Sequence, residues 1–374
     1  MYKRQILTLP LHTNYGGILQ AYALQTVLEK MGHKTMMIDK GWPPKVPFIN
    51  YLKRTIKESF KKLLGHSNQR WHWIFFQYGE MLKEHQYTIQ FVNKYIHRKI
   101  QRDLYAISNG DFDGFVVGSD QIWRVQYYRP IINAYLDFTK GWNVKRVAYA
   151  ASFGTDEWEY DAVETSDCAN LLQGFDAVSV RERSGIALCK TYFHREDVQH
   201  VLDPTLLLTS EDYVNRLGLA TVAKSKGDFL VYILDMTAEK QQIVDFIAKQ
   251  YGLTPFYVNS KCDDKSYNIK NRIQPPVEAW LRGFCDAKFV FTDSFHACAF
   301  SLIFNKPFFV YGNKERGMSR FESLLSSFGL DNRLIGSFGE ITANINDEIN
   351  WKTINGIMSK KRTESLGFLE KSLK

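Results

Sequence analysis

The least ordinary stretch of the sequence is "FTDSFHACAFSLIFNKPFFVYGNKERGMSR", residues 291–320. It predicts a strand, then Asp293 and Ser294, then His296 in the first turn of an apolar helix. A histidine at that place faces the positive end of the helix dipole. It therefore stays neutral unless an anion, either Asp293 or a bound phosphate, stabilises its charged form. With such support, His296 becomes a candidate proton donor.

A lone buried histidine usually has a structural role, and that alternative stays open for His296. The neighbouring residue types favour chemistry instead, because an acid and a hydroxyl, Asp293 and Ser294, come just before it. The cations that follow are Lys314, Arg316 and Arg320. We predict a proton-donating, anion-binding site here.

A second stretch, "VSVRERSG" at residues 178–185, predicts a strand that ends with Arg181, Glu182 and Arg183. Alternate residues of a strand point the same way, so Arg181 and Arg183 are expected to reach one space. Two guanidinium groups suit a phosphate or a carboxylate better than lysines do. The alternative is a pair of surface arginines bonded to Glu182 and its neighbours.

A third stretch, "GSDQIWR" at residues 118–124, follows a predicted buried strand. Ser119, Asp120 and Gln121 are then expected at the carboxyl edge of a sheet, with Trp123 offering a flat apolar face. A carboxylate that binds hydroxyls beside an indole that stacks on C–H groups suits a sugar. Asp120 could equally be a helix cap.

The opening loop, "NYGGILQAYALQTVLEKMGHK" at residues 14–34, places Gly16 and Gly17 before an amphipathic helix. Its spacing matches neither the dinucleotide-binding nor the P-loop motif. A helix N-terminus remains, capped by Asn14, where free N–H groups can hold an anion or a hydroxyl. Equally, the two glycines could have no role in binding and only allow the chain to turn.

These stretches must be positioned by an alternation of strands and helices. Strands are expected at "QILTLP", "KTMMID", "GFVVGSD", "RVAYAAS", "AVSVRE" and "VQHVLDP", and a second series follows at "FLVYILD", "TPFYVNS", "AKFVFTDS" and "KPFFVYG". Two Rossmann-like parallel-sheet α/β domains that face each other across a cleft are the simplest interpretation. We expect them at residues 1–204 and 205–340, with helices of 341–374 packing back onto the first domain.

The composition excludes several classes of protein. The chain has 374 residues, 45% of them hydrophobic and 24% charged, as folded globular proteins do. Its five scattered cysteines include no C-x-x-C pair, which disfavours a disulfide framework or a zinc site, and no spacing suggests another metal. Without a signal peptide or an apolar run of membrane-spanning length, a cytoplasmic protein, soluble or peripheral to a membrane, is expected.

A basic helical insertion is expected at residues 41–110, where twelve Lys and Arg stand against three Glu. Cations interleaved with apolar residues are typical of a helix on an anionic membrane surface. A helical hairpin whose apolar face packs on its own domain is the favoured alternative. Nucleic acid is not expected as a partner, because no nucleic-acid-binding signature accompanies the charge.

Taken together and in this order, five stretches resemble the polysaccharide pyruvyl transferase family. They are "NYGGILQAYALQTVLEKMGH", "GSDQIW", "VSVRERSG", "VLDPTLLL" and "TDSFHACAFSLIFNKPF", within residues 5–335. The resemblance implies two Rossmann-type domains arranged as in B-type glycosyltransferases. It also implies transfer of pyruvate from phosphoenolpyruvate to a sugar as a ketal, with release of phosphate and with no cofactor.

The resemblance also implies roles for particular residues. His296 would be the acid or a phosphate ligand, and Arg181 would bind the carboxylate or the phosphate of the donor. Together with Asp293, these are the expected catalytic residues. The acceptor side would comprise Asn14, Tyr15, Gly16, Gln20, Ser119, Asp120 and Trp123. Many relatives have Arg-Leu-His-Gly around the histidine, whereas this chain has Ser294 in place of the arginine. The donor-binding residues are then expected to be Ser294 with Arg183, Arg316 and Arg320.

The sequence therefore predicts a cytoplasmic pyruvyl transferase that acts on a bacterial surface-polysaccharide precursor. The precursor is expected to be lipid-linked, with the 41–110 segment near the membrane. A nucleotide-sugar-dependent glycosyltransferase is the alternative enzyme, disfavoured because no Glu-rich ribose-binding motif is present. A non-catalytic relative is the third hypothesis, suggested by Ser294.

Overall fold

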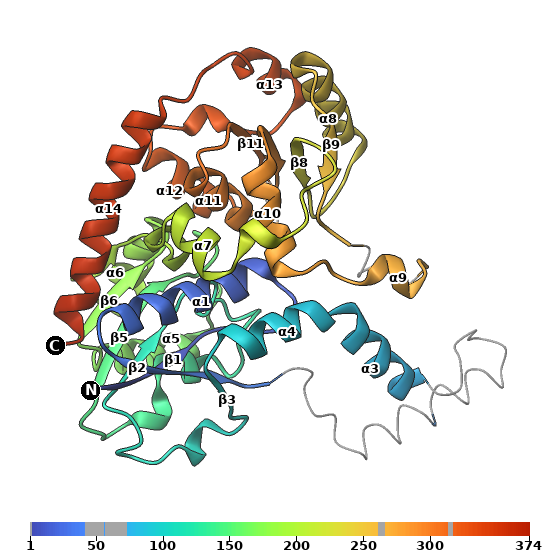
Figure 1. Ribbon diagram of the computed structural model, residues 1–374. Helices are drawn as coiled ribbons and strands as arrows, with labels where there is room; N and C mark the ends of the chain where they lie inside the picture. The colour runs from blue at the N-terminus through green and yellow to red at the C-terminus, as the bar shows by residue number, and fades with distance from the viewer. Residues whose placement is uncertain (1, 42–55, 57–72, 261–265, 313–316) are drawn as a thin grey trace.

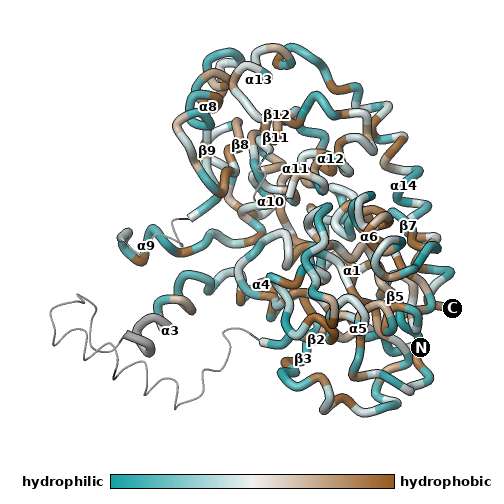
Figure 2. The backbone as a smooth tube through the Cα atoms, turned by 180° about the vertical axis from the view of Figure 1, so that it is seen from behind, coloured by the Kyte–Doolittle hydropathy of each residue, from teal (hydrophilic) through white to brown (hydrophobic). Residues whose placement is uncertain are grey.

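The computed structural model describes residues 2–41, 56, 73–260, 266–312 and 317–374, and of residues 73–78 only the backbone. Two α/β bodies lie one above the other, and the last long helix runs along both (Figure 1). Hydrophobic segments gather along strands such as β2 and β5, whereas much of α8 and α14 is hydrophilic (Figure 2). The expected pair of parallel-sheet domains is confirmed.

The first domain is built on a seven-stranded sheet of order β3-β2-β1-β4-β5-β6-β7, and its described strand pairs are all parallel. The strands are β1 Lys3–Leu7, β2 Lys34–Asp39, β3 Arg98–Ile100, β4 Gly114–Val117, β5 Lys145–Ala151, β6 Ala177–Val180 and β7 Gln199–His200. The central strand β4 is apolar and buried along its whole length, as a strand covered on both faces must be.

The second domain has a five-stranded sheet of order β12-β11-β10-β8-β9, again with parallel pairs. Its strands are β8 Phe229–Tyr232, β9 Pro255–Tyr257, β10 Phe289–Thr292, β11 Phe308–Tyr311 and β12 Leu334–Ile335. The first four lie within the expected strands. The two-residue β12 was not expected, because it is too short to show a pattern in the sequence.

Helices connect and cover the strands. The α-helices are α1 Tyr15–Lys30, α3 Trp73–Glu84, α4 Gln86–Tyr95, α5 Ala162–Leu172, α6 Ser184–Phe193, α7 Ser210–Arg216, α8 Ala238–Tyr251, α9 Ile269–Arg272, α10 Val277–Asp286, α11 Phe295–Ile303, α12 Ser319–Ser326, α13 Phe338–Asn344 and α14 Trp351–Ser372. Short 3₁₀ turns are η1 Leu104–Ala106, η2 Ile131–Tyr135, η3 Asp137–Thr139, η4 Pro204–Leu207, η5 Leu219–Thr221 and η7 Asp331–Arg333.

The final two helices attach to different domains. The backbone N–H of Phe338 at the start of α13 donates to Glu239 of α8, in the second domain. Helix α14 instead returns to the first domain, where Ser365 accepts from the backbone N–H of Leu202 at 3.0 Å. Near its end, the carbonyl of Leu373 accepts from the Arg4 guanidinium at 2.7 Å.

The basic insertion is described only in part, since residues 42–55 and 57–72 lie outside the described ranges. Its helix α4 buries Phe91 and Val92, and the Phe91 ring lies 5.9 Å from that of Tyr22 on α1. Helix α4 therefore packs on its own domain, as the hairpin alternative expects. Helix α3 instead reaches the second domain, where Arg272 of α9 binds Glu80 at 2.9 Å and Glu84 at 3.1 Å. In the described ranges, no helix is both long enough and apolar enough to cross a membrane.

Candidate active site

A cavity of about 700 Å³ opens where the two domains meet. Its first-domain wall comes from the loop after β1, the start of α1 and the loop after β4, with residues such as Asn14 and Asp120. Its second-domain wall comes from the carboxyl ends of β8 and β10, with residues such as Asp293 and His296. The expected cleft thus lies at the carboxyl ends of both sheets, as open α/β folds favour.

The start of α1 brings Gly16 against the second domain. The Asn14 side chain accepts from the backbone N–H groups of Gly16 (2.9 Å) and Gly17 (3.3 Å), which confirms the predicted helix cap. A Cβ on Gly16 would lie 1.9 Å from Nδ1 of His296. The glycine is therefore required because the imidazole occupies the space where a side chain would be.

His296 follows directly after the first residue of α11, and its side chain is buried. Among the described residues its Nε2 has no hydrogen-bond partner, and Oδ2 of Asp203 lies 3.8 Å away. Burial lowers the pKa of His296, and the nearby Arg181 and Arg320 lower it further, against the pull of Asp203 and Asp120. The imidazole is therefore held neutral, as predicted, with burial as the leading cause.

Asp293 does not support His296 as expected. Its carboxylate accepts from Lys240 at 2.8 Å and from the backbone N–H groups of Leu234 (2.7 Å) and Asp235 (3.3 Å). Asp293 lines the cavity, but its hydrogen bonds tie the loop after β8 to the end of β10. The carboxylates that act on His296 are Asp203 and Asp120, so the expectation for Asp293 is wrong.

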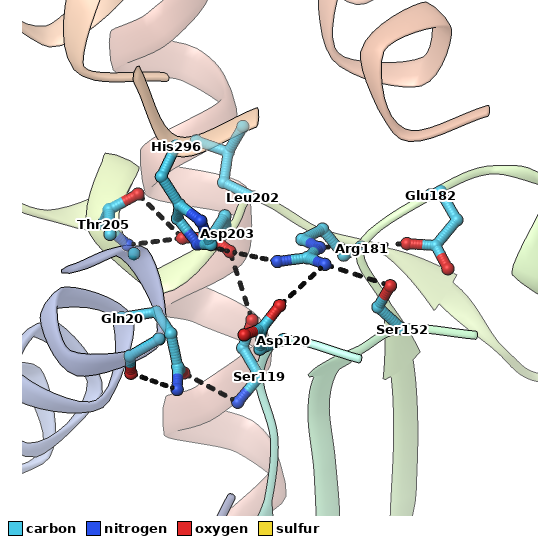
Figure 3. Close-up of polar contacts among 12 residues, drawn as sticks. Gln20, Ser119, Asp120, Ser152, Arg181, Glu182, Leu202, Asp203, Thr205 and His296 are labelled. Atoms are coloured by element: carbon cyan, nitrogen blue, oxygen red, sulfur yellow. Dashed lines mark hydrogen bonds and ion pairs between the residues drawn. The ribbon is translucent and has the colours of Figure 1, made fainter. Parts of the chain in front are cut away.

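The predicted arginine pair does not share one space. Strand β6 ends at Val180, so the alternation on which the prediction depended stops before Arg181. Arg181 is buried and binds Asp203 at 3.0 Å, Asp120 at 3.3 Å and Oγ of Ser152 at 3.1 Å. Arg183 is exposed and does not line the cavity. Arg181 is therefore the centre of a buried ionic network (Figure 3), and a shared anion clamp is ruled out.

Arg320, on α12, is the predicted donor-binding cation that lines the cavity. Its guanidinium lies 5.7 Å from the centre of the Phe295 ring, which Arg181 also contacts at 4.6 Å. Burial, together with repulsion by Arg181, lowers the pKa of Arg320 to about 10, so it remains charged at neutral pH. Ser294 lines the same wall. Arg316 falls outside the described residues.

Gln20, Ser119 and Asp120, all predicted on the acceptor side, differ in whether they hold a loop in place or line the cavity. Gln20 is fully buried and donates to Oγ1 of Thr8 at 2.8 Å. Its oxygen accepts from the backbone N–H of Ser119 at 3.0 Å, and the Ser119 hydroxyl donates to Asp203 at 3.2 Å (Figure 3). Gln20 and Ser119 thus hold the loop after β4 in place, while Asp120 itself reaches the cavity wall.

Trp123 is a core residue, and its predicted role as a sugar platform is wrong. The ring is fully buried and stacks on Tyr135 with centroids 5.0 Å apart and planes 10° apart. Phe153 lies 5.3 Å from it. Tyr15, by contrast, lines the cavity and joins the domains, because its hydroxyl donates to the carbonyl of Pro275 at 2.6 Å.

Several residues of the site were missed by the sequence analysis. Asp203 is the most important, and the signal for it was present in "VLDP", where an acid just before a proline caps the turn η4. The others line the cavity wall on either side of the cleft: His12, His85, Tyr127, Asn259, Gln274 and Phe295. In the described part of the chain, no group of three His, Cys, Asp or Glu side chains is arranged to hold a metal ion.

The fold is a two-domain α/β arrangement like that of the B-type glycosyltransferases, and Asp120, His296 and Arg320 line the cleft between the domains. A sequence model described as polysaccharide pyruvyl transferase matches residues 14–315. The chain therefore belongs to the polysaccharide pyruvyl transferase family. No curated protein sequence matches it.

Solved structures support the fold. Arabidopsis thaliana UGT89C1 complexed with UDP-L-rhamnose is 8% identical over all of both chains, with a TM-score of 0.51. S. aureus MnaA with UDP is 11% identical over 96% of this chain and 91% of that one, with a TM-score of 0.50. At such identities the likeness shows the arrangement of the domains alone.

Proposed function

We propose that this protein transfers pyruvate from phosphoenolpyruvate to a sugar of a bacterial surface-polysaccharide precursor, forming a ketal and releasing phosphate. The observation that carries the proposal is that His296 and Arg320 line one wall of the cavity, facing the first domain. A titratable imidazole beside a guanidinium suits a donor that is both anionic and activated by protonation.

The donor is proposed to bind on the second-domain side of the cavity. Arg320 replaces the arginine that relatives carry at the position of Ser294, and it would bind the phosphate or the carboxylate. Its neighbourhood is apolar on one side, where Phe295 contacts the guanidinium. Low polarity strengthens a charge-assisted hydrogen bond to an anion. Arg181 is assigned no direct contact with the donor, because Asp203 and Asp120 bind its guanidinium.

The chemistry requires one acid and two hydroxyl groups. A proton added to the methylene carbon of phosphoenolpyruvate leaves a cationic C2, to which a sugar hydroxyl adds with loss of its proton. The C2–O bond to phosphate then breaks, and a second hydroxyl adds to the renewed cation. The two sugar hydroxyls lose two protons in total. One of them makes up for the proton added to the methyl group, and the other ends on the released phosphate. His296 would supply the first proton.

The acceptor is proposed to lie against the first-domain wall and the adjoining loops. That part of the cavity is lined by uncharged hydrogen-bonding side chains, which are Asn14, Gln121, Tyr127, Asn259 and Gln274. His12 is there too, and burial lowers its pKa to about 4, so it is neutral at pH 7. Neutral donors and acceptors of this kind suit sugar hydroxyls.

A lipid-linked acceptor is part of the proposal, with the basic 41–110 segment near an anionic membrane surface. The support is the excess of cations between Lys45 and Arg102, twelve Lys and Arg against three Glu. Sedimentation with vesicles tests it: binding to vesicles that contain anionic lipid, and none to neutral vesicles, is expected. Equal recovery with both would contradict the membrane contact.

The function itself is tested with purified protein, phosphoenolpyruvate and a panel of galactose- and N-acetylmannosamine-type acceptors. We expect phosphate release with at least one acceptor and calorimetric binding of phosphoenolpyruvate. Thermal-shift measurement with nucleotide sugars tests the glycosyltransferase alternative, because only a true donor raises the midpoint appreciably. A shift with a nucleotide sugar and none with phosphoenolpyruvate would overturn the proposal.

A further inference from the structure

Asp203 is held in a fixed orientation deep beneath the cavity. Only 2% of the residue is exposed. Its Oδ1 accepts from the backbone N–H (2.9 Å) and the hydroxyl (2.7 Å) of Thr205. Its Oδ2 accepts from Ser119 (3.2 Å) and Arg181 (3.0 Å) and faces Nε2 of His296 at 3.8 Å (Figure 3). A carboxylate fixed by four donors cannot easily turn away from the imidazole.

The charges around His296 act on its protonation in both directions. The carboxylates of Asp203 and Asp120 raise the pKa of the imidazole, whereas the guanidiniums of Arg181 and Arg320 lower it. Without a ligand, burial prevails and lowers the pKa. A bound anion would add negative charge and shift the balance toward the imidazolium.

The pair also joins the two domains. Asp203 lies in the first domain, at the start of η4, whereas His296 belongs to α11 of the second domain. The groups that face the imidazole come from both sides: Gly16, Asp120, Arg181 and Asp203 from the first domain, and Arg320 from the second. The 3.8 Å separation is slightly longer than a hydrogen bond, so a small approach of the domains would make one.

We propose that Asp203 is the positioning residue for His296: it orients the imidazole and stabilises its protonated form, so that binding of the anionic donor makes His296 take up a proton. The identity of that donor rests on the proposed function. The Asp203–His296 pairing is a property of the chain and is testable with inorganic phosphate alone. Asp203 is not assigned a contact with substrate.

The test is an NMR titration of protein labelled in its histidine rings, with the His296 signals identified by their loss in His296→Gln. In the unchanged protein, phosphate is expected to raise the pKa of His296 by about one unit. In Asp203→Asn, the pKa should be lower than in the unchanged protein, both without and with phosphate. Asp197→Asn removes an exposed acid that binds Arg195 and is the matched control, expected to leave the His296 titration unchanged.

Activity adds a second readout. Asp203→Asn is expected to lower kcat at least tenfold at nearly constant KM for phosphoenolpyruvate. An unchanged His296 titration in Asp203→Asn overturns the inference, even where pyruvyl transfer is found. The expected titration together with no binding of phosphoenolpyruvate would instead reject the proposed function and leave the pairing intact.

If Asp203→Asn does not fold, Asp203→Glu is the second variant to test, because the glutamate keeps the negative charge that pairs with Arg181. With the longer side chain, the phosphate-induced rise of the His296 pKa should persist, since the negative charge remains. The orientation of the imidazole should change, so kcat should still fall about tenfold. An Asp203→Glu protein with full kcat would contradict the positioning role.

Discussion

The imidazole of His296 lies against the backbone of Gly16, so closely that a Cβ on residue 16 would fall 1.9 Å from Nδ1. These residues are 280 positions apart and belong to different domains. Gly16 was predicted on the acceptor side and His296 as the acid. Their contact means that the acceptor wall and the acid meet at one point of the cleft.

Gly16→Ala should therefore damage the site rather than the helix. The added methyl group must displace the His296 ring, and such overpacking costs about 1–3 kcal/mol of stability. We expect the rate of pyruvyl transfer to fall by at least tenfold, with a lower thermal midpoint. Gly17→Ala is the comparison, because a Cβ there meets nothing closer than 3.4 Å. Equal losses in the two variants would show that helix geometry, and not the histidine, requires the glycine.

Arg320→Met should weaken donor binding, whereas Arg183→Met should not. Arg320 lines the cavity, and loss of one charge-assisted hydrogen bond, about 1.5–3 kcal/mol, corresponds to roughly 10- to 150-fold in affinity. Arg183 is exposed outside the cavity and is the matched control. Calorimetry with phosphoenolpyruvate makes the comparison, after thermal unfolding has shown that both variants fold. Weaker binding in Arg183→Met alone would favour the arginine pair predicted from the sequence.

Trp123 should matter for stability and not for recognition of the sugar. Its ring is buried against Tyr135, so Trp123→Ala should cost about 3–5 kcal/mol of unfolding free energy. Trp123→Phe preserves most of the packing and should leave the KM for the acceptor unchanged. Denaturant unfolding and acceptor kinetics measure the two effects. A raised acceptor KM in a fully stable Trp123→Phe protein would favour the sugar platform after all.

Acid should destabilise the fold through two histidines. Burial lowers the pKa of His12 and of His200 to about 4, against 6.5 for an unfolded chain. Between these values the unfolded state binds more protons, so stability is complete above pH 6.5 and falls as the pH drops toward 4. One pH unit of pKa shift is worth about 1.4 kcal/mol, so each histidine contributes on the order of 3 to 3.5 kcal/mol over the whole window.

Denaturant unfolding at pH 7.5 and pH 5 measures this loss. His200→Gln should reduce the difference between the two values, because the ring that must remain neutral is gone. At the domain interface, Nε2 of His200 donates to the carbonyl of Arg181 at 3.0 Å and lies 3.2 Å from Oγ of Ser323. The glutamine amide can make similar bonds without titrating. An unchanged pH dependence in His200→Gln would reject the assignment.

Much of the fold follows from local sequence. Most of the strands, the Asn14 cap and the helix that carries His296 depend on residues within a few positions of one another, where the period of apolar residues and capping chemistry act. The short strands β3 and β12 and the end of β6 at Val180 were not predicted. All three depend on hydrogen bonds to other strands.

The site was less predictable, because its residues are related by tertiary contacts. Arg181 has the right chemistry for an anion, but acids from the loops after β4 and β7 bind it first. Trp123 follows a loop whose Asp120 has a φ of 56°, and the turn directs the indole into the core. Neither fact is visible in the spacing of residues. Asp203 was quoted within a motif, but only its distance to His296 shows what it does.

The chain passes between the domains twice, first between α7 and β8 and again between α13 and α14. Two domains joined by one connecting segment can rotate relative to each other about any axis. A second connecting segment restricts this motion mainly to rotation about the line between the two connections. Opening of the cleft would then carry His296 away from Gly16 and Asp203 together. His296 would then lose its contact with Gly16 and its neighbouring carboxylate in one movement, so opening of the cleft and a change in the protonation of His296 would be linked.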